Sequence, residues 1–205
     1  MKLLSFFETK KILEKYKIPI LETYFLEKID DFKKVKISPP WVIKLSGIPH
    51  RTEKKAVFLK VKEKNLKEVL KKIFSLKEKL KAEGVLVQRY FEGIELFLGG
   101  KEDKIFGKIL LFGLGGIFVE VLKDISYGIC PLSKKEAEEM IKNLKGYKIL
   151  KGYRKKEGVS EKKLQKILLS FSRLLEKEKE IKEVDLNPLL GKGKEIFAAD
   201  FKIWI

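Results

Sequence analysis

The sequence predicts an α/β protein built from α+β lobes, and three observations support this fold class. Short apolar runs typical of strands alternate with longer segments whose apolar residues recur at helical spacing. Prolines and glycines separate the strand-like runs. The chain has 205 residues, of which 44% are hydrophobic, so it can bury a substantial core. Strands mixed with helices favour a sheet protein over a helical bundle.

The first half of the chain predicts a helix, several strands and a second helix. Ser5 and Glu8 have the spacing of a capping box, so a helix begins there. Pro19 then bars a helix interior and indicates extended chain. The expected elements are a helix over 5–16, an extended segment over 17–28, strands over 39–46 and 56–62, a helix over 65–81, and two strands within 84–100 around a Glu92-Gly93 turn.

The second half predicts a sheet that surrounds a glycine cluster, FGLGG, at residues 112–116. We expect a lobe boundary near residue 83, where a lysine-rich helix gives way to strands, and hence lobes of 1–83 and 84–205. The expected elements are strands over 104–112 and 117–122, helices over 133–145 and 160–180, and strands over 181–190 and 195–205 joined by residues 191–194.

The chain is strongly basic, with 46 Lys and Arg against 29 Asp and Glu, a formal net charge of +17. This charge predicts an anionic partner such as a nucleotide, coenzyme A, nucleic acid or an acidic subunit. Lysines dispersed among glutamates over 61–84 are more typical of a solvated helix face than of a nucleic-acid groove. The Lys, Glu and Ile bias resembles the ion-pair-rich surfaces of thermophile proteins, and an AT-rich genome would give a similar bias.

Cysteine content and hydropathy predict a cytoplasmic protein. The single Cys130 excludes an internal disulfide and fits a reducing compartment. The first residues lack the apolar core of a signal peptide, and no apolar run reaches the length of a membrane helix.

Polar residues near the C-terminal end suggest a metal site. Asp185 and Asn187 are two residues apart, so on a strand they share one face, and Asp200 interrupts an apolar run. Asn187 and Asp200 would meet across a hairpin and offer oxygen ligands to Mg²⁺, which needs only one or two from a protein. The alternative is that Asn187-Pro188 only turns the chain while Asp200 pairs with a lysine.

Three further features leave their roles open. Lys44, inside the apolar run WVIKL, either snorkels to the surface or presents a fixed charge to phosphate. His50, the single histidine, is either a surface residue or a phosphoryl acceptor. FGLGG matches neither GxGxxG nor a Walker A loop, and one His with one Cys cannot close a zinc site.

Four segments resemble the ATP-grasp β subunit of ADP-forming acyl-CoA synthetases, the archaeal acetate–CoA ligases related to succinyl-CoA synthetase. They are FGLGGIFVEVLKDISYGICPLSKKEAEEMI at 112–141, LKGYKILKGYR at 144–154, IKEVDLNPLL at 181–190 and AADFKIWI at 198–205. The resemblance implies an ATP-grasp fold with nucleotide held between two lobes. It also implies a partner α subunit that binds CoA and carries an active-site histidine, in an α2β2 assembly. The implied reaction is acyl-CoA + ADP + phosphate ⇌ acid + ATP + CoA, through a phosphohistidine relay.

The same resemblance implies roles for individual residues, with Mg²⁺ and ATP or ADP as cofactors. Lys44 matches the lysine at the nucleotide phosphates, and Glu95 the acid near the ribose. Asn187 and Asp200 match the magnesium ligands. His50 matches the histidine that shuttles phosphate between the α-subunit histidine and ADP. Gln88, Arg89 and Tyr90 match the hinge beside the adenine.

The chain departs from the family around His50. Lys44 and His50 are six residues apart where the family has eight, and Lys54 and Lys55 replace a glycine pair before the next strand. Glu83 and Arg154 also match the family, without an assigned role. A non-catalytic ATP-grasp scaffold subunit is therefore the alternative to the synthetase subunit, and a basic nucleic-acid-binding module is the weaker alternative.

Overall fold

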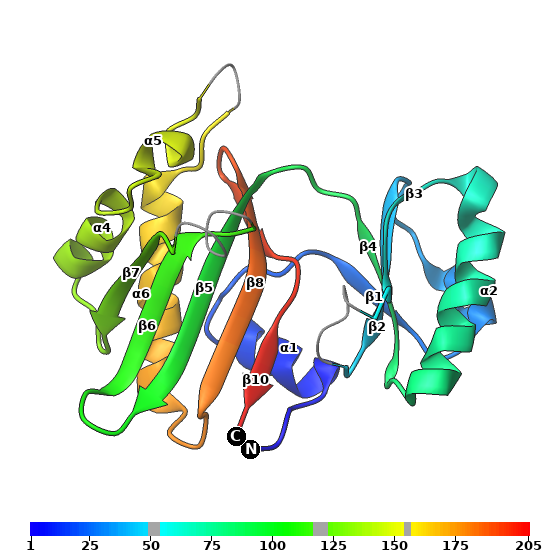
Figure 1. Cartoon of the computed structure of the whole chain (residues 1–205), viewed down its shortest axis with the longest axis horizontal. Helices are drawn as coiled ribbons and strands as arrows, with labels where there is room; N and C mark the ends of the chain where they lie inside the picture. Colours follow the sequence, from blue (N-terminus) through cyan, green and yellow to red (C-terminus); the bar gives the residue numbers. More distant parts are fainter. Residues whose placement is uncertain (49–53, 117–122, 154–156) are drawn as a thin grey trace. The chain divides into compact units, whose positions relative to one another are not determined.

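The computed structural model describes residues 1–48, 54–116, 123–153 and 157–205. It divides the chain into two compact units (Figure 1). The smaller unit is Leu21–Phe91, and the larger unit combines Met1–Ile20 with Glu92–Ile205. This division differs from the expected boundary at residue 83 in two ways. The first helix belongs with the C-terminal part, and the strand after residue 83 belongs with the N-terminal strands.

The smaller unit is a four-stranded antiparallel sheet in the order β1-β4-β2-β3. Helix α2 covers one face of it (Figure 1). The helix presents a buried stripe, Val69, Leu70, Ile73 and Phe74, at helical spacing. Its elements are β1 (Thr23–Leu26), the 3-10 helix η1 (Ile29–Lys34), β2 (Trp41–Ser46), β3 (Val57–Val61), α2 (Glu63–Leu80) and β4 (Gly84–Arg89).

The larger unit is built on a six-stranded sheet in the order β10-β8-β5-β6-β7, with β9 paired to β8. Its elements are α1 (Phe6–Lys15), β5 (Ile94–Asp103), β6 (Gly107–Leu114), β7 (Ile125–Ile129), α4 (Lys134–Lys142), α5 (Tyr147–Leu150), α6 (Glu161–Lys177), β8 (Glu183–Lys192), β9 (Glu195–Ala198) and β10 (Lys202–Trp204).

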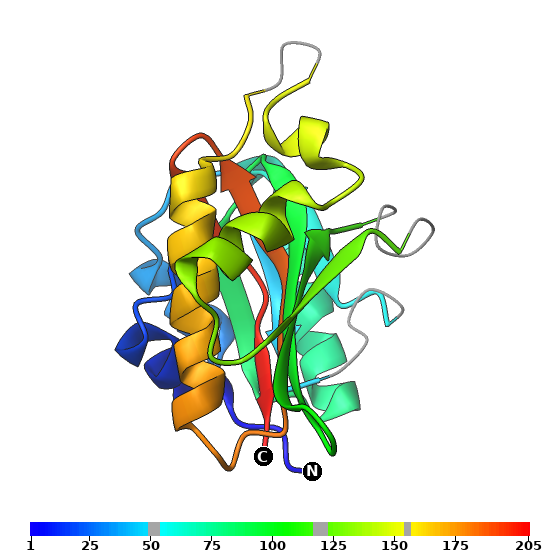
Figure 2. The same ribbon diagram turned by 90° about the vertical axis from the view of Figure 1, so that its left-hand side faces the viewer.

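Helices α4 and α6 lie on one face of this sheet (Figure 2). Phe171 of α6 is fully buried, as are Leu98 of β5 and Leu186 of β8, so the core lies between helix and sheet. Alternate residues of the same strands, including Glu95, point to the opposite face, because side chains alternate along a strand. That opposite face carries the predicted site residues of this unit.

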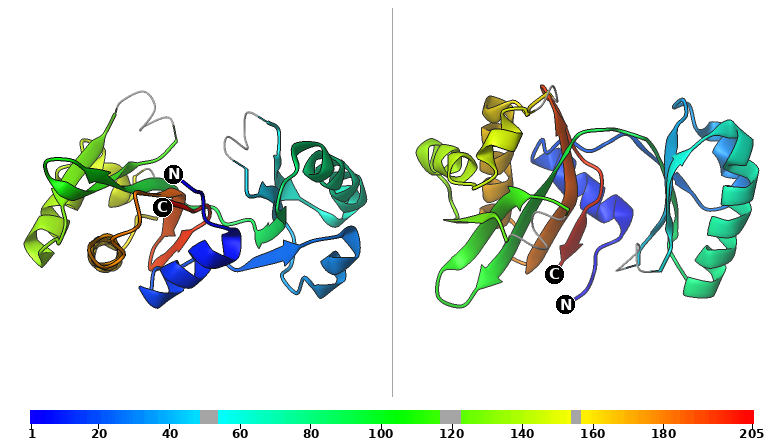
Figure 3. Two further views of the ribbon diagram at one scale, coloured as in Figure 1. Left: turned by 90° about the horizontal axis from the view of Figure 1, so that it is seen from below. Right: turned by 45° about the horizontal axis from the view of Figure 1, so that its top comes forward.

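Helix α1 joins the same unit. Its predicted capping box is present, since the Ser5 hydroxyl accepts from the Glu8 amide and the Glu8 carboxylate accepts from the Ser5 amide. The Phe6 ring stacks on Phe201 with 5.5 Å between centroids. At the other end, Lys15 donates to Glu178 just after α6, with 2.6 Å between Nζ and Oε1. The view from below shows α1 and α6 on the same side of the sheet (Figure 3).

Most predicted elements are confirmed, with three corrections. The two strands within 84–100 are present, but β4 and β5 belong to different sheets, so Glu92-Gly93 connects the units and does not close a hairpin. The last predicted strand breaks at Asp200 into β9 and β10. Strand β7 was not predicted, and the strand expected over 117–122 lies outside the described residues.

None of the helices in the described part of the chain is long and apolar enough to cross a membrane.

The core position of Phe171 gives a test of this packing. Phe171→Ala should lower the free energy of unfolding by about 3–5 kcal/mol, because it removes a fully buried ring and leaves a cavity. The matched control is Phe106→Ala, whose side chain is 59% exposed and should change stability by less than about 0.5 kcal/mol. Denaturant unfolding followed by circular dichroism measures both. Equal losses would contradict the placement of α6.

Candidate functional site

The pairing of β8 brings Asn187 and Asp200 together. Leu189 pairs with Ala198 on one side of them, and Asp185 pairs with Lys202 on the other, in one continuous antiparallel register. That register sets Asp200 opposite Asn187. The Asp200 amide approaches the carbonyl of Pro188, with 3.4 Å between N and O. Asp200 therefore lies in the short break between β9 and β10, next to Asn187 of β8.

Asp185 lies near Asn187 and Asp200, and we call this part of β8, together with Asp200, its acidic end. Asp185 lies on β8 between Gly99 of β5 and Lys202 of β10. The missing side chain of Gly99 leaves room for the Phe97 ring, whose Cζ lies 2.7 Å from where a Cβ on Gly99 would be. Oδ1 of Asp185 is buried and makes no hydrogen bond to any described residue. The pKa of this carboxyl is raised to about 6, chiefly by burial; the charge of Lys202 lowers the pKa, and the charges of Asp200 and Glu183 raise it.

These three residues fit a hard cation. Mg²⁺ prefers oxygen ligands and takes only one or two from a protein, keeping water and phosphate for its other positions. Asn187 and Asp200 are the candidates that would supply those oxygens, and a cation beside them would offset the uncompensated buried oxygen of Asp185. No group of three or more His, Cys, Asp and Glu side chains suited to a metal occurs in the described ranges.

Lys44 and Gln88 share one face of the four-stranded sheet. Val42 pairs with Gln88 and Lys44 pairs with Leu86, so the two side chains are diagonal neighbours on β2 and β4. They point away from the α2 face, since Ile43 and Val87 between them are part of that core. Lys44 is only 5% exposed, which does not match a lysine that snorkels into water. The Gln88 amide donates to the Thr23 hydroxyl, with 2.8 Å between Nε2 and Oγ1.

Arg89 and Tyr90 follow at the end of β4. The Tyr90 amide donates to the carbonyl of Pro40 at 2.8 Å, so this N–H is engaged within the smaller unit. The Lys60 amine lies over the Tyr90 ring at 5.1 Å, and the Arg89 guanidinium over the Phe91 ring at 5.2 Å. These contacts order the segment just before the chain passes into the larger unit.

Glu95 contacts the glycine cluster. The Gly115 amide donates to the Glu95 carbonyl at 2.7 Å. Gly116 has φ +58°, and a Cβ there would lie 2.9 Å from Oε2 of Glu95. A glycine at this position therefore satisfies both a left-handed backbone and a close approach to the carboxylate. Within the described residues, the glycine cluster shapes the surroundings of Glu95.

His50 lies outside the described residues, but both ends of its loop are defined. Before it, the Ser46 hydroxyl donates to Glu83 Oε2 at 3.0 Å, and Gly47 packs on Glu83 with φ +72°. After it, Ala56 is fully buried and its carbonyl accepts from the Leu45 amide at 3.1 Å. Glu83, a residue without an assigned role in the sequence, thus anchors the entry to the His50 loop. Arg154 also lies outside the described residues.

Lys55 occupies an unusual conformation in this region. Its φ is +51°, a left-handed value that glycine adopts without strain. This is one of the two positions where the chain carries lysines in place of the family glycines.

Cys130 does not have the environment of a nucleophile. Burial raises the pKa of its thiol, which disfavours the reactive thiolate.

Sequence reasoning missed the importance of Asp185. The signal was its two-residue spacing from Asn187, which places both on one face of a strand. Its burial could not be read from the sequence, because it depends on which strands lie on either side of it, β5 and β10.

Comparison with known proteins identifies the fold. The ATP-grasp domain family matches residues 1–205. The chain belongs to this family. An ATP-grasp domain explains a chain of two α+β units, and it makes the acidic end of β8 and the lysine of β2 the natural candidates for nucleotide and metal contacts.

Two characterised relatives show which ATP-grasp proteins the chain resembles. It is 40% identical over 202 residues to acetate–CoA ligase [ADP-forming] II of Archaeoglobus fulgidus, a match that covers 96% of this chain and 29% of the ligase. The chain thus spans less than a third of that relative's length. It is 35% identical over 210 residues to the acetate–CoA ligase [ADP-forming] II β subunit of Pyrococcus furiosus, covering 96% of this chain and 89% of the subunit.

Solved structures of an acetyl-coenzyme A synthetase 1 from Ca. Korarchaeum cryptofilum have the same fold. One complex, with coenzyme A and Ca-AMPCP, matches with a TM-score of 0.90 and 31% identity, over 100% of this ATP-grasp domain and 93% of that chain. A second, with coenzyme A and Mg-AMPPCP, has a phosphohistidine segment pointing towards the nucleotide site; it matches with a TM-score of 0.83 and 32% identity over the same shares.

The raised pKa of Asp185 predicts a pH dependence of stability. The folded protein holds this proton to about pH 6, whereas an unfolded carboxyl releases it near 3.8. The proton on Asp185 therefore stabilises the folded protein fully below about pH 4, and this stabilisation is lost as the pH rises to about 6. Asp185→Asn should remove that loss, so its stability relative to wild type should rise by about 2–3 kcal/mol between pH 4 and pH 7 without magnesium. Urea unfolding at both pH values measures it, and an equal difference at both would contradict the buried charge.

The left-handed Lys55 predicts a stabilising glycine. Lys55→Gly should raise the free energy of unfolding by about 1 kcal/mol, because glycine adopts this φ without a side-chain clash. Lys54→Gly is the matched control, since Lys54 has no left-handed φ and should gain nothing. Thermal unfolding of the two variants provides the comparison, and indistinguishable variants would show that the conformation of Lys55 carries no strain.

Proposed function

We propose that this chain is the nucleotide-binding β subunit of an ADP-forming acyl-CoA synthetase. With a CoA-binding α subunit it would interconvert acyl-CoA, ADP and phosphate with the free acid, ATP and CoA. The observation that carries the proposal is the register of β8, which sets Asp200 opposite Asn187 in an ATP-grasp domain. The identity to the Pyrococcus furiosus β subunit, over nearly the whole of both chains, supports the same reading.

The residues divide the work of phosphoryl transfer. Asn187 and Asp200 hold Mg²⁺, which neutralises charge on the phosphates when bound. Lys44 adds a fixed positive charge near those phosphates, and Gln88, Arg89 and Tyr90 line the adenine side. Glu95 takes the ribose hydroxyls. His50 accepts the phosphoryl group from the α-subunit histidine and passes it to ADP.

The partner supplies what this chain lacks in the proposal. The fused Archaeoglobus fulgidus relative is more than three times as long as the matched region, and the Pyrococcus furiosus relative is named as a β subunit. Both support our proposal of a separate α subunit that binds CoA and carries the phosphohistidine, in an α2β2 assembly. The phosphohistidine segment in the Ca. Korarchaeum cryptofilum complex supports the relay.

Nucleotide binding tests the first half of this proposal. Lys44→Met and Asp200→Asn should each weaken Mg·ATP binding by roughly tenfold or more, since each removes a charge that faces phosphate or metal. The matched controls are Lys33→Met and Asp30→Asn, two exposed residues that form an ion pair in the smaller unit. Isothermal titration calorimetry measures all four, and unchanged binding in Lys44→Met and Asp200→Asn would reject the assigned site.

Phosphorylation tests the second half. Incubation with γ-labelled ATP, Mg²⁺ and the α subunit should give acid-labile label that disappears in His50→Ala. Label on the α subunit that is unaffected by His50→Ala would mean that this loop has lost its relay role. Absence of both label and ATP binding would favour the scaffold subunit instead.

A further inference from the structure

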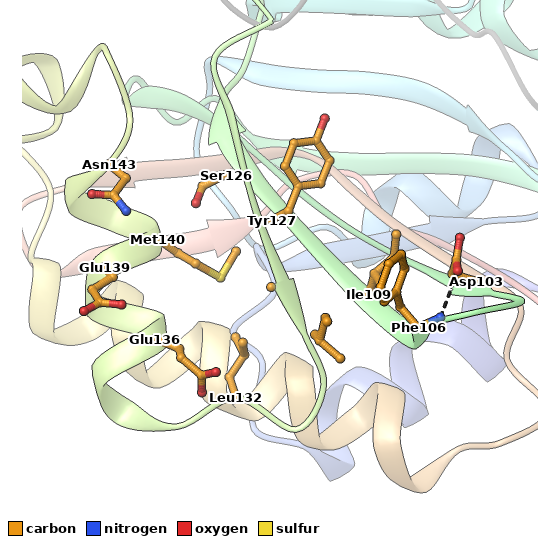
Figure 4. Close-up of a pocket in the computed structure, with 12 residues that line it drawn as sticks. Asp103, Phe106, Ile109, Ser126, Tyr127, Leu132, Glu136, Glu139, Met140 and Asn143 are labelled. Atoms are coloured by element: carbon orange, nitrogen blue, oxygen red, sulfur yellow. Dashed lines mark hydrogen bonds between the residues drawn. The ribbon is translucent and has the colours of Figure 1, made fainter.

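The outer edge of the six-stranded sheet carries an exposed apolar groove. It has a volume of about 630 Å³ and lies around β7, between α4 and the turn that joins β5 to β6. Figure 4 shows Met140, Glu136 and Glu139 of α4 on one side of β7, and Tyr127, Ile109 and Phe106 on the other. The groove is remote from the acidic end of β8, because β5 and β6 lie between β8 and β7.

Several large apolar side chains are exposed here: Phe106, Tyr127 and Ile129 line the groove, and Ile105 is the chain neighbour of Phe106. Ile105 is 85% exposed, Phe106 59%, Tyr127 65% and Ile129 53%. Asp103 fixes the turn that carries the first two, since its Oδ1 accepts from the amides of Ile105 and Phe106 at 2.8 and 3.0 Å. A cluster of large apolar side chains held outward by an ordered turn marks an interaction surface.

Strand β7 also offers main-chain groups. Among the described residues it is the last strand in the order β10-β8-β5-β6-β7. The Cys130 amide donates to the Lys108 carbonyl at 2.8 Å, which fixes the alternation along β7. By that alternation the N–H and C=O groups of Tyr127 and Ile129 point away from β6. An extended peptide can add to such an edge as a further strand.

The charged residues in the lining are all acidic, although the chain is basic. Asp103, Glu136 and Glu139 border the groove, whereas the whole chain carries +17. Two copies of this chain that met across a two-fold axis at β7 would set these same acids against one another, which disfavours a homodimer here. Apolar contacts bordered by carboxylates suit an extended segment with apolar side chains flanked by Lys or Arg.

We propose that the β7 groove docks an extended, apolar and basic segment of the CoA-binding subunit, which adds as a strand to the edge of the sheet. This inference rests on the proposed function for the identity of the partner. The length of the fused relative beyond the matched region shows that a large additional polypeptide accompanies this domain there. Docking on β7 would attach that polypeptide while leaving the acidic end of β8 uncovered.

The test uses this chain and its CoA-binding subunit, purified separately and mixed. Hydrogen exchange should slow at the amides of Tyr127 and Ile129 when the complex forms. Ile129→Lys should weaken the complex at least tenfold, because lysine blocks edge pairing, and Glu139→Lys should weaken it about threefold or more. The matched controls are Leu59→Lys, 63% exposed on β3, and Glu138→Lys, on α4 but outside the groove lining. Both controls should bind within about twofold of wild type.

Several outcomes would overturn the proposal: wild-type affinity in Ile129→Lys and Glu139→Lys, no complex at all, or a wild-type homodimer that Ile129→Lys dissociates. Mg·ATP binding, measured on each variant, keeps the two proposals separate. Retained nucleotide binding without docking at β7 would reject the groove and leave the nucleotide-binding role standing. Loss of nucleotide binding in the wild-type chain would reject the proposed function itself.

Discussion

The larger unit depends on the pairing of strand β8. This strand pairs with β5 along one edge and with β9 and β10 along the other. Its buried residues Val184 and Leu186 belong to the helix-covered core, while Asp185 and Asn187 point to the other face. A slip of one residue would exchange these two sets, so the burial of the core also fixes the position of the polar site.

The acidic end of β8 destabilises the folded chain when no cation is bound. An acid with a buried oxygen that lacks a hydrogen bond is expensive, and the neighbouring Asp200 adds to the cost. A bound cation would offset both terms. The pKa of Asp185 is raised to about 6 chiefly by this burial.

The basic composition of the chain has two consequences at different places. A net charge of +17 suits nucleotide and CoA as anionic ligands. Against that background the acidic border of the β7 groove stands out, because Glu136 and Glu139 favour a partner of the opposite charge. The acidic end of β8 and the groove lie on separate strands of one sheet, with β5 and β6 between them.

The sequence by itself determined the short-range features: the capping box at Ser5, the helical stripes of α2 and α6, and the shared face of Asp185 and Asn187. These follow from contacts within a few residues, which local spacing records. Only the tertiary structure decided that Asp200 stands opposite Asn187, that β4 and β5 belong to different sheets, and that α1 packs with the C-terminal part. Strand partners and buried charges depend on residues far apart in the chain, such as Gly99 beside Asp185. No local pattern records which distant surface will bury which side chain, and so the register, the units and the groove required the fold.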